Sequence, residues 1–237
     1  MIIDAQALTE SAAYKLLIGS ILPRPIAWVS TLSRQGVANL APISFFTAVG
    51  RRPPKISLSL QPRSDGTSLK DTFTNIRDTG EFVVNMATVP DANAVHDSAH
   101  EYDPEEDEFT VLGIGKAACE VVSVPRIASA PIAYECRLDR IIPVSGTENV
   151  VWGEILRFHI RDDLYLERGR IDTGALSPVG RLAAEYTYVE NTFTTPLSAE
   201  ALTAVQGTRM RRLDGKAADF SPIDTPLWSP SGSTRSD

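Results

Sequence analysis

The sequence feature that most constrains the fold is the stretch Pro23–Phe46, PRPIAWVSTLSRQGVANLAPISFF. Its first half, Ile26–Thr31, is rich in β-branched and aromatic residues, which favour strands. Ser33-Arg34-Gln35-Gly36 is turn material, and Gly36 can adopt a positive φ. Val37–Phe46 then returns as a second apolar run. The stretch therefore predicts two β-strands joined by a tight turn.

Polar residues are unusually frequent inside this predicted hairpin. Ser30, Thr31, Asn39 and Ser44 all have apolar neighbours. Polar groups that become buried need hydrogen-bond partners. Four such groups in a short unit suggest that a ligand outside the chain supplies those partners.

Composition excludes several classes of protein. The 237 residues carry a formal net charge of −7, so a general nucleic-acid-binding role is not expected. No apolar run approaches the roughly 18–20 residues of a membrane span. Met1–Thr9 has no basic start and no long apolar core, so no secretory signal is predicted. We therefore expect a cytoplasmic protein without a membrane partner, in which Cys119 and Cys136 are reduced, buried and inert.

Periodicity predicts a β-rich domain decorated with helices. Lys55–Gln61 alternates apolar and polar residues, as a half-buried strand does. The other predicted strands are Glu81–Asn85, Glu120–Val124, Ala133–Val144, Asn149–Arg161 and Glu185–Val189, and the predicted helices are Thr9–Leu17, Ser68–Arg77, Ala92–His100 and Ser198–Val205. We predict one domain over residues 1–194 and a partly helical or extended tail over residues 195–237.

One candidate binding site can be derived from the residues alone. The helix predicted at Ser68 carries Lys70 and Thr72 near its start, where free N–H groups and a partial positive charge favour an anion. Hydroxyls from Ser30, Thr31 and Ser59 could add donors. The alternative is that Ser68 only caps the helix and Lys70 is a solvated side chain.

Three further motifs do not indicate a specific function. His96 and His100 are four residues apart but lack a third metal ligand, so a solvated or capping role is expected. The acidic run Asp103–Glu108 lacks the spacing of a calcium loop and is predicted to be a solvated loop. Leu112–Gly115 contains GxG without the third glycine or the βαβ unit of a dinucleotide site.

Taken together, several segments resemble the flavin reductase-like family, the FMN-binding split-barrel flavoproteins, in its longer members. The resemblance covers Tyr14–Val189 and is specific only in combination. The segments that carry it are PRPIAWVST, GVANLAPISFF, RPPKISLSL, KDTFTNIRDTGEFVVN, VPRIASAPIAYECRL, VVWGEILRFHI and VGRLAAEYTYV.

The resemblance implies a mainly β protein with helices, a homodimeric split β-barrel that holds FMN non-covalently near the dimer interface. Trp28–Thr31 and Asn39–Ser44 would flank the isoalloxazine, and Lys70–Thr72 would meet the phosphate. Tyr186, with Arg181, would reach a neighbouring subunit's site. The implied cofactor-binding residues are Trp28, Ser30, Thr31, Asn39, Ala41, Ser44, Ser59, Gln61, Lys70, Asp71, Thr72 and Arg181.

The implied activity is electron transfer from NADH or NADPH to flavin, with reduced FMN passing to a monooxygenase or another acceptor. No catalytic acid or base is implied, because the flavin carries the chemistry. One departure concerns the turn Gly146–Asn149, where short NADH-using relatives often carry Gly-Asp-His. His159 is not its equivalent. An FMN-bound electron carrier, or a flavoenzyme with another substrate, therefore remains the alternative.

Overall fold

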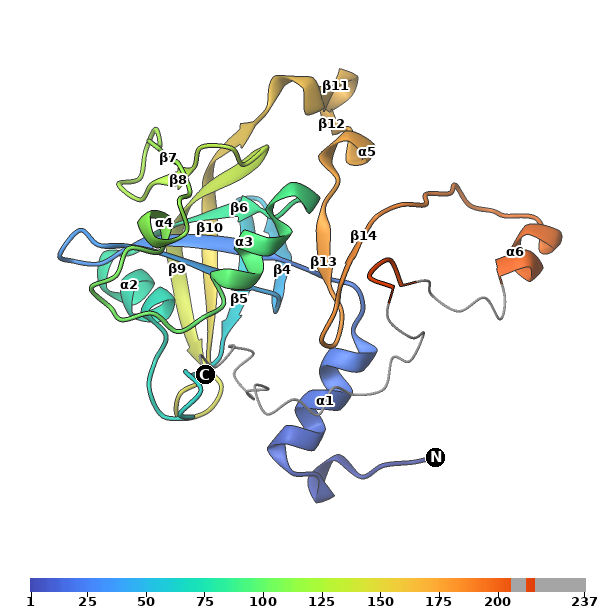
Figure 1. Ribbon diagram of the computed structural model, residues 1–237, viewed down its shortest axis with the longest axis horizontal. Coiled ribbons are helices and arrows are strands. Elements are labelled where there is room, and N and C mark those ends of the chain that lie inside the picture. Colours follow the sequence, from blue (N-terminus) through green and yellow to red (C-terminus); the bar gives the residue numbers. More distant parts are fainter. Residues whose placement is uncertain (206–211, 216–237) are drawn as a thin grey trace.

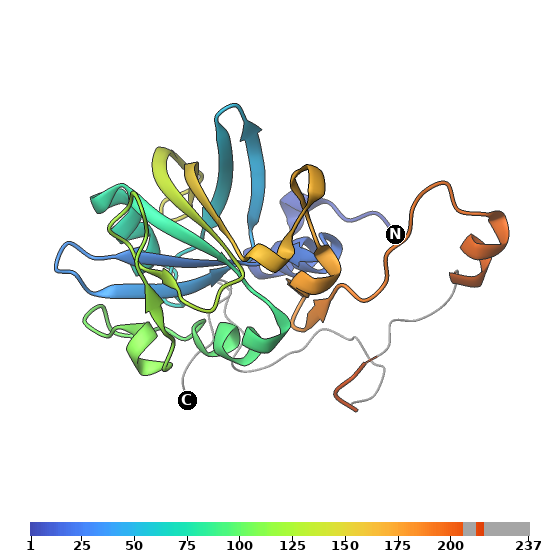
Figure 2. The same ribbon diagram turned by 90° about the horizontal axis from the view of Figure 1, so that it is seen from above.

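The computed structural model describes residues 1–205 and 212–215, and its centre is a seven-stranded antiparallel sheet (Figure 1). The sheet curls around an apolar core, with the long β9–β10 pair running through its middle (Figures 1 and 2). Its strands lie in the order β3 (Ala38–Ile43), β2 (Ala27–Leu32), β6 (Glu81–Met86), β9 (Ile132–Pro143), β10 (Asn149–Ile160), β5 (Pro54–Leu60) and β4 (Phe46–Arg51).

Smaller elements surround this sheet. The short strands are β1 (Arg24–Pro25), β13 (Val179–Arg181) and β14 (Tyr186–Tyr188) in one sheet, β7 (Lys116–Ala117) and β8 (Arg126–Ile127) in a second, and β11 (Tyr165–Leu166) and β12 (Arg170–Ile171) in a third. The α-helices are α1 (Glu10–Ser20), α2 (Asp71–Thr79), α3 (Ala92–Asp97), α4 (Glu108–Val111), α5 (Thr173–Leu176) and α6 (Ala199–Val205). The 3₁₀ turns are Ala5–Ala7, Val89–Asp91, Asp162–Leu164 and Glu167–Gly169. None of the helices among the described residues has the length and apolar character needed to cross a bilayer.

Alternation along the strands decides which side chains enter the core. Ile56, Leu58 and Leu60 of β5 are buried, while the serines between them are only partly covered, as the period-2 pattern predicts. They pack with Phe82 and Val84 of β6. The predicted hairpin is also confirmed, because β2 pairs with β3 and Gly36 between them has a φ of 84°.

Gly153 of β10 is a position where the core leaves no room for a side chain. A Cβ atom there would overlap the ring of Phe82, which is fully buried. We expect Gly153→Ala to lower the free energy of unfolding by about 1–3 kcal/mol, the usual cost of overpacking. Chemical denaturation measures this loss. Gly146→Ala is the matched control, because nothing lies within 4 Å of its added Cβ; equal losses in both variants would contradict the steric account.

Several predicted elements differ from the structure, among them three whose cause or extent is clear. Glu120–Val124 is not a strand, because the carboxylate of Glu135 accepts the backbone N–H groups of Glu120, Val121 and Val122. The helix predicted at Ser68 begins at Asp71, since Asp65 accepts hydrogen bonds from the backbone N–H and hydroxyl of Ser68. The helix predicted to reach His100 ends at Asp97.

The C-terminal part of the chain leaves the barrel after β14. The predicted helix at Ser198–Val205 is confirmed as α6, which lies apart from the barrel in both views (Figures 1 and 2). Arg212 returns to the domain, where its guanidinium donates to Glu185 at 3.2 Å. Residues 206–211 and 216–237 lie outside the described part of the chain, so the division at residue 194 stays a prediction.

Candidate functional site

Two adjoining cavities lie beside β3, and they hold about 440 and 400 Å³ of space, part of which is open to solvent. They share Pro42 and Ala99, so they form neighbouring parts of one hollow. The first is lined by Asn39, Ala41, Pro42, Arg63, Lys70, Asp71, Thr72, Ser98, Ala99, His100, Glu101, Tyr102 and Glu108. The second is lined by Ile26, Pro42, Ser44, Val95, His96, Ala99, Arg181 and Tyr186.

The start of α2 gives the first cavity its cationic end. Lys70 is the residue immediately before the helix, so its side chain emerges where the N–H groups of the first turn lie. Arg63 forms an ion pair with Asp71 and donates to the carbonyl of Tyr102 at 3.1 Å. Burial lowers the pKa of the Lys70 ammonium to about 8. Two cations at a helix start form a site suited to an anion such as a phosphate.

A buried polar network forms another wall of the first cavity. The amide of Asn39 donates to the Glu108 carboxylate at 2.5 Å, and the backbone N–H of Leu40 donates to its other oxygen at 3.2 Å. The hydroxyl of Thr72 donates to the Asn39 side-chain carbonyl at 3.0 Å. Burial raises the pKa of Glu108 to about 7. The prediction that Asp103–Glu108 is entirely a solvated loop is therefore wrong at Glu108, which is 5% exposed and begins α4.

The raised pKa of Glu108 makes stability depend on pH. The folded protein retains a proton between pH 4.5 and about 7 that the unfolded chain has lost, so the free energy of unfolding falls as the pH rises through this range. We expect a loss of roughly 3 kcal/mol that Glu108→Gln does not show. Denaturation at several pH values measures it. The exposed Glu106→Gln is the control; the same pH dependence in wild type and Glu108→Gln would refute the assignment.

The second cavity is lined by aromatic and cationic side chains. The Arg181 guanidinium lies 4.5 Å from the ring centroid of Tyr186. The Tyr186 hydroxyl lies 3.5 Å from Nδ1 of His96, and burial raises the pKa of Tyr186. Ser44 accepts a hydrogen bond from Arg24 at 3.3 Å. Flat side chains and a guanidinium suit a planar ring that carries hydrogen-bond acceptors.

The structure brings seven of the twelve predicted site residues to these cavities. Asn39, Ala41, Lys70, Asp71 and Thr72 line the first cavity, and Ser44 and Arg181 line the second. Ser59 and Gln61 lie outside both linings, where the Gln61 amide donates to the Ser59 hydroxyl at 3.3 Å.

Three predicted residues of β2 point their side chains into the protein. The Trp28 indole donates to Ser98 at 2.9 Å, the Ser30 hydroxyl donates to the Pro125 carbonyl at 2.7 Å, and the Thr31 hydroxyl donates to Asn39 at 3.2 Å. All three residues are buried. The expectation that an outside ligand supplies the partners of the buried polar groups is therefore wrong for Ser30 and Thr31, because the chain itself provides them.

Several cavity residues were not among the predicted site residues. His96 and His100 were assigned a solvated or capping role, yet each lines one cavity. Arg63 and Tyr102 also line the first cavity and were not singled out from the sequence. The only sequence signal is that Arg63 is a basic residue shortly before the helix at Lys70. Tyr102 gives no such signal, because the fold and not the spacing brings it to the cavity.

The comparison with known families agrees with this geometry. Residues 18–177 match the family described as the flavin reductase like domain. The chain belongs to the flavin reductase-like family. Membership makes it a flavin-related oxidoreductase.

Solved structures support the same assignment. Nitrilotriacetate monooxygenase component B from Bacillus cereus is 37% identical with a TM-score of 0.78, over 82% of this chain and 98% of its own. The 2-nitrobenzoate 2-nitroreductase NbaA from Pseudomonas fluorescens is 31% identical with a TM-score of 0.75, over 84% of this chain and 97% of its own. A Shewanella frigidimarina protein with a split barrel domain is 21% identical with a TM-score of 0.72, over 84% of this chain and all of its own. The fold of this flavin reductase-like chain is thus a split barrel.

Proposed function

We propose that this flavin reductase-like chain binds FMN non-covalently in the two adjoining cavities and transfers electrons from NADH or NADPH to it. The observation that carries the proposal is the pair of cations, Lys70 and Arg63, at the start of α2. Both cations line the same hollow as the helix start, although Arg63 also forms an ion pair with Asp71. A phosphate there would accept charge-assisted hydrogen bonds from these cations and from the N–H groups of the first turn.

The donors in the hollow fit FMN along its length. Ammonium, guanidinium and helix N–H groups at one end suit a phosphate, and the polar side chains of Asn39 and Thr72 suit a polyol chain. Tyr186 and Arg181 in the second cavity suit a ring with carbonyl and nitrogen acceptors. Ser59, Gln61 and the buried β2 residues Trp28, Ser30 and Thr31 would act through the backbone or by supporting the wall.

The side chains bind and orient rather than react. Lys70 and Arg63 would fix the phosphate, and the rigid strand β3 would hold the ring edge along Asn39–Ser44. FMN supplies hydride and electron transfer, which no side chain of the site provides. No acid or base is therefore assigned a catalytic step.

The choice of electron donor is where this chain departs from the short NADH-using relatives. The turn Gly146–Asn149 between β9 and β10 lacks histidine, and Thr147 there donates to the carbonyl of Gly66 at 3.3 Å. The alternative is an FMN-bound carrier or flavoenzyme that does not use NAD(P)H directly. The similarity to a monooxygenase component B supports a monooxygenase as the acceptor.

A homodimer is part of the proposal. Apolar side chains are exposed on and directly after α1, where Leu16, Leu17, Ile21 and Leu22 are each at least 43% exposed. Contiguous exposed apolar surface favours association. Arg181 and Tyr186 line this chain's own second cavity, so a neighbouring subunit is not needed to bring them to it.

The test is anaerobic reduction of the purified, flavin-loaded protein. We expect FMN to co-purify or to rebind, and NADH or NADPH to bleach its visible absorbance. Bleaching by dithionite but by neither nucleotide would support the carrier alternative. Absence of FMN binding under all conditions would overturn the proposal.

A further inference from the structure

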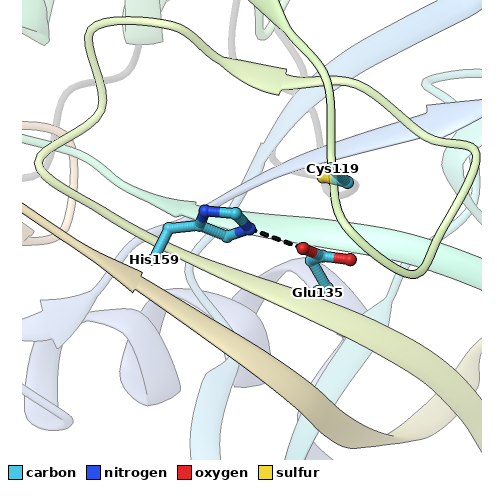
Figure 3. Close-up of side chains that lie close together, drawn as sticks. All are labelled: Cys119, Glu135 and His159. Carbon is cyan, nitrogen blue, oxygen red and sulfur yellow. Dashed lines mark hydrogen bonds and ion pairs between the residues drawn. The ribbon is translucent and has the colours of Figure 1, made fainter.

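A second group of reactive side chains lies away from the two cavities. Cys119, Glu135 and His159 lie close together (Figure 3). They lie on what we call the outer face of the sheet, the face of Val83 and Ala133, which is turned away from the main core. One sulfur, one carboxylate oxygen and one imidazole nitrogen all lie within 4.8 Å of one another. None of the three residues lines either cavity.

The antiparallel pairing of β9 with β10 brings two of these residues together. His159 is opposite Ala133, and Glu135 lies two residues further along β9. Residues two apart on a strand share a face, and a diagonal cross-strand pair is within reach of long side chains. Nε2 of His159 accordingly lies 2.5 Å from Oε1 of Glu135.

The third residue arrives on the loop between β7 and β8. Glu135 is fully buried and holds this loop to the sheet. Its Oε1 accepts the N–H of Glu120 at 2.8 Å, and its Oε2 accepts the N–H groups of Val121 and Val122 at 2.8 and 3.1 Å. Cys119 directly precedes the anchored segment. The carboxylate that fixes the loop therefore also fixes the thiol over the face of the sheet.

We propose that Cys119, Glu135 and His159 bind a zinc ion. Thiolate sulfur, imidazole nitrogen and carboxylate oxygen are the three ligand types that Zn²⁺ accepts, at about 2.0–2.3 Å. Ligand atoms within 4.8 Å of one another can meet at such a centre with small side-chain rotations. The thiolate and the carboxylate together balance the two charges of the ion.

The ion takes the place of protons that the site holds without it. When zinc binds Nε2 of His159 and Oε1 of Glu135, the hydrogen that now lies between these atoms transfers through solvent to Nδ1 of the imidazole, and the two ligand atoms move apart to admit the ion. The Cys119 thiol would lose its proton to solvent. Glu135 keeps its backbone N–H donors, as carboxylate ligands commonly do. Cys119 and His159 are only partly buried, so the prediction that both cysteines are buried is wrong for Cys119, and water can complete a tetrahedron.

Geometry argues against a nucleophilic Cys–His–Glu relay at the same residues. In such a relay the imidazole lies between the nucleophile and the acid and bonds one with each ring nitrogen. Here Nε2 faces Glu135, while the other ring nitrogen is turned away from Cys119 (Figure 3). The three groups point toward a common centre rather than along a line.

The experiment uses the full chain after dialysis against a chelator, titrated with Zn²⁺ alone and then with Co²⁺ as a spectroscopic probe. We expect one zinc per chain by elemental analysis, a thiolate-to-cobalt charge-transfer band, and a higher melting temperature with zinc. Cys119→Ser and His159→Gln should weaken zinc by more than about 100-fold, because loss of an outer partner alone costs roughly 10–100-fold. Cys136→Ala and His100→Gln are the matched controls and should bind as the wild type does.

Cys119→Ser leaves the Glu135 anchor intact and should fold, which circular dichroism checks. The cobalt spectrum of the wild-type chain tests the zinc proposal even if Cys119→Ser does not fold. A wild-type chain that binds no zinc, or binds cobalt without the charge-transfer band, overturns the proposal. So does a folded Cys119→Ser variant with wild-type affinity. Metal content is read without flavin, so this result is separate from the proposed FMN function.

Discussion

Lys70→Ala should weaken FMN binding by about 10–100-fold and leave riboflavin binding nearly unchanged. The ammonium lies at the start of α2, where the proposed phosphate would sit. A hydrogen bond to a charged group is worth roughly 1.5–3 kcal/mol, and riboflavin has no phosphate to lose it. Titration of flavin fluorescence with each ligand measures both affinities.

The control for this substitution is a lysine remote from the hollow. Lys55 pairs with Asp139 at 2.6 Å and lines neither cavity, so Lys55→Ala should leave both affinities unchanged. Thr72→Ala is a poorer probe, because that hydroxyl also supports Asn39. Equal loss of FMN and riboflavin in Lys70→Ala would mean that the phosphate binds elsewhere.

The same lysine predicts how FMN affinity depends on pH. Its pKa in the free protein is lowered to about 8. A bound phosphate favours the ammonium, so binding above that pH requires proton uptake. FMN affinity should therefore fall by up to about tenfold per pH unit above pH 8, whereas an ordinary lysine would keep it constant to about pH 10. Riboflavin, and FMN with Lys70→Ala, should lack this slope.

The alternation of apolar and polar residues was sufficient to predict those strands of the sheet that have one buried face. Lys55–Gln61 was predicted from alternation alone, and β5 has that burial pattern. Glu120–Val124 shows why the rule fails elsewhere. Its valines are apolar enough for a strand, but its N–H groups bond to a side chain on β9, not to a neighbouring backbone. A side-chain partner 14 or 15 residues further along the chain leaves no trace in the local pattern.

Cavity residues could be predicted where a local signal such as a helix start places them. They could not be predicted where contacts between segments distant in sequence place them. The sequence predicts Lys70 at a helix start, and Lys70 does lie immediately before α2, although this helix begins later than expected, at Asp71; the anion site itself stays a prediction. Glu108 was misread because five of the six residues from Asp103 to Glu108 are acidic, which suggests solvent. Its burial is decided by Asn39, 69 positions away. Buried polar residues likewise indicate a partner without saying whether chain or ligand provides it.

Glu135→Ala should lower the free energy of unfolding by about 3–5 kcal/mol, the largest effect that we expect of a single substitution here. The carboxylate is fully buried, and three backbone N–H groups and His159 depend on it. Its removal leaves those donors without their acceptor, and the N–H group of Val122 is buried together with it. Denaturation measures the loss, and hydrogen exchange at Glu120–Val122 should become faster while exchange in the seven-stranded sheet changes less.

Glu154→Ala separates this anchor from the general effect of losing a charge. Glu154 pairs with Arg137 at 3.4 Å on a neighbouring part of β10, and the Arg137 side chain is 61% exposed. An exposed pair of this kind is worth about 0–1 kcal/mol. A similar small loss in Glu135→Ala, with slow exchange kept at Glu120–Val122, would show that the apolar contacts of Val122 and Val124 alone hold the loop. A large loss of unfolding free energy in Glu135→Ala alone would show that this carboxylate holds the loop to the sheet, whether or not a metal is bound.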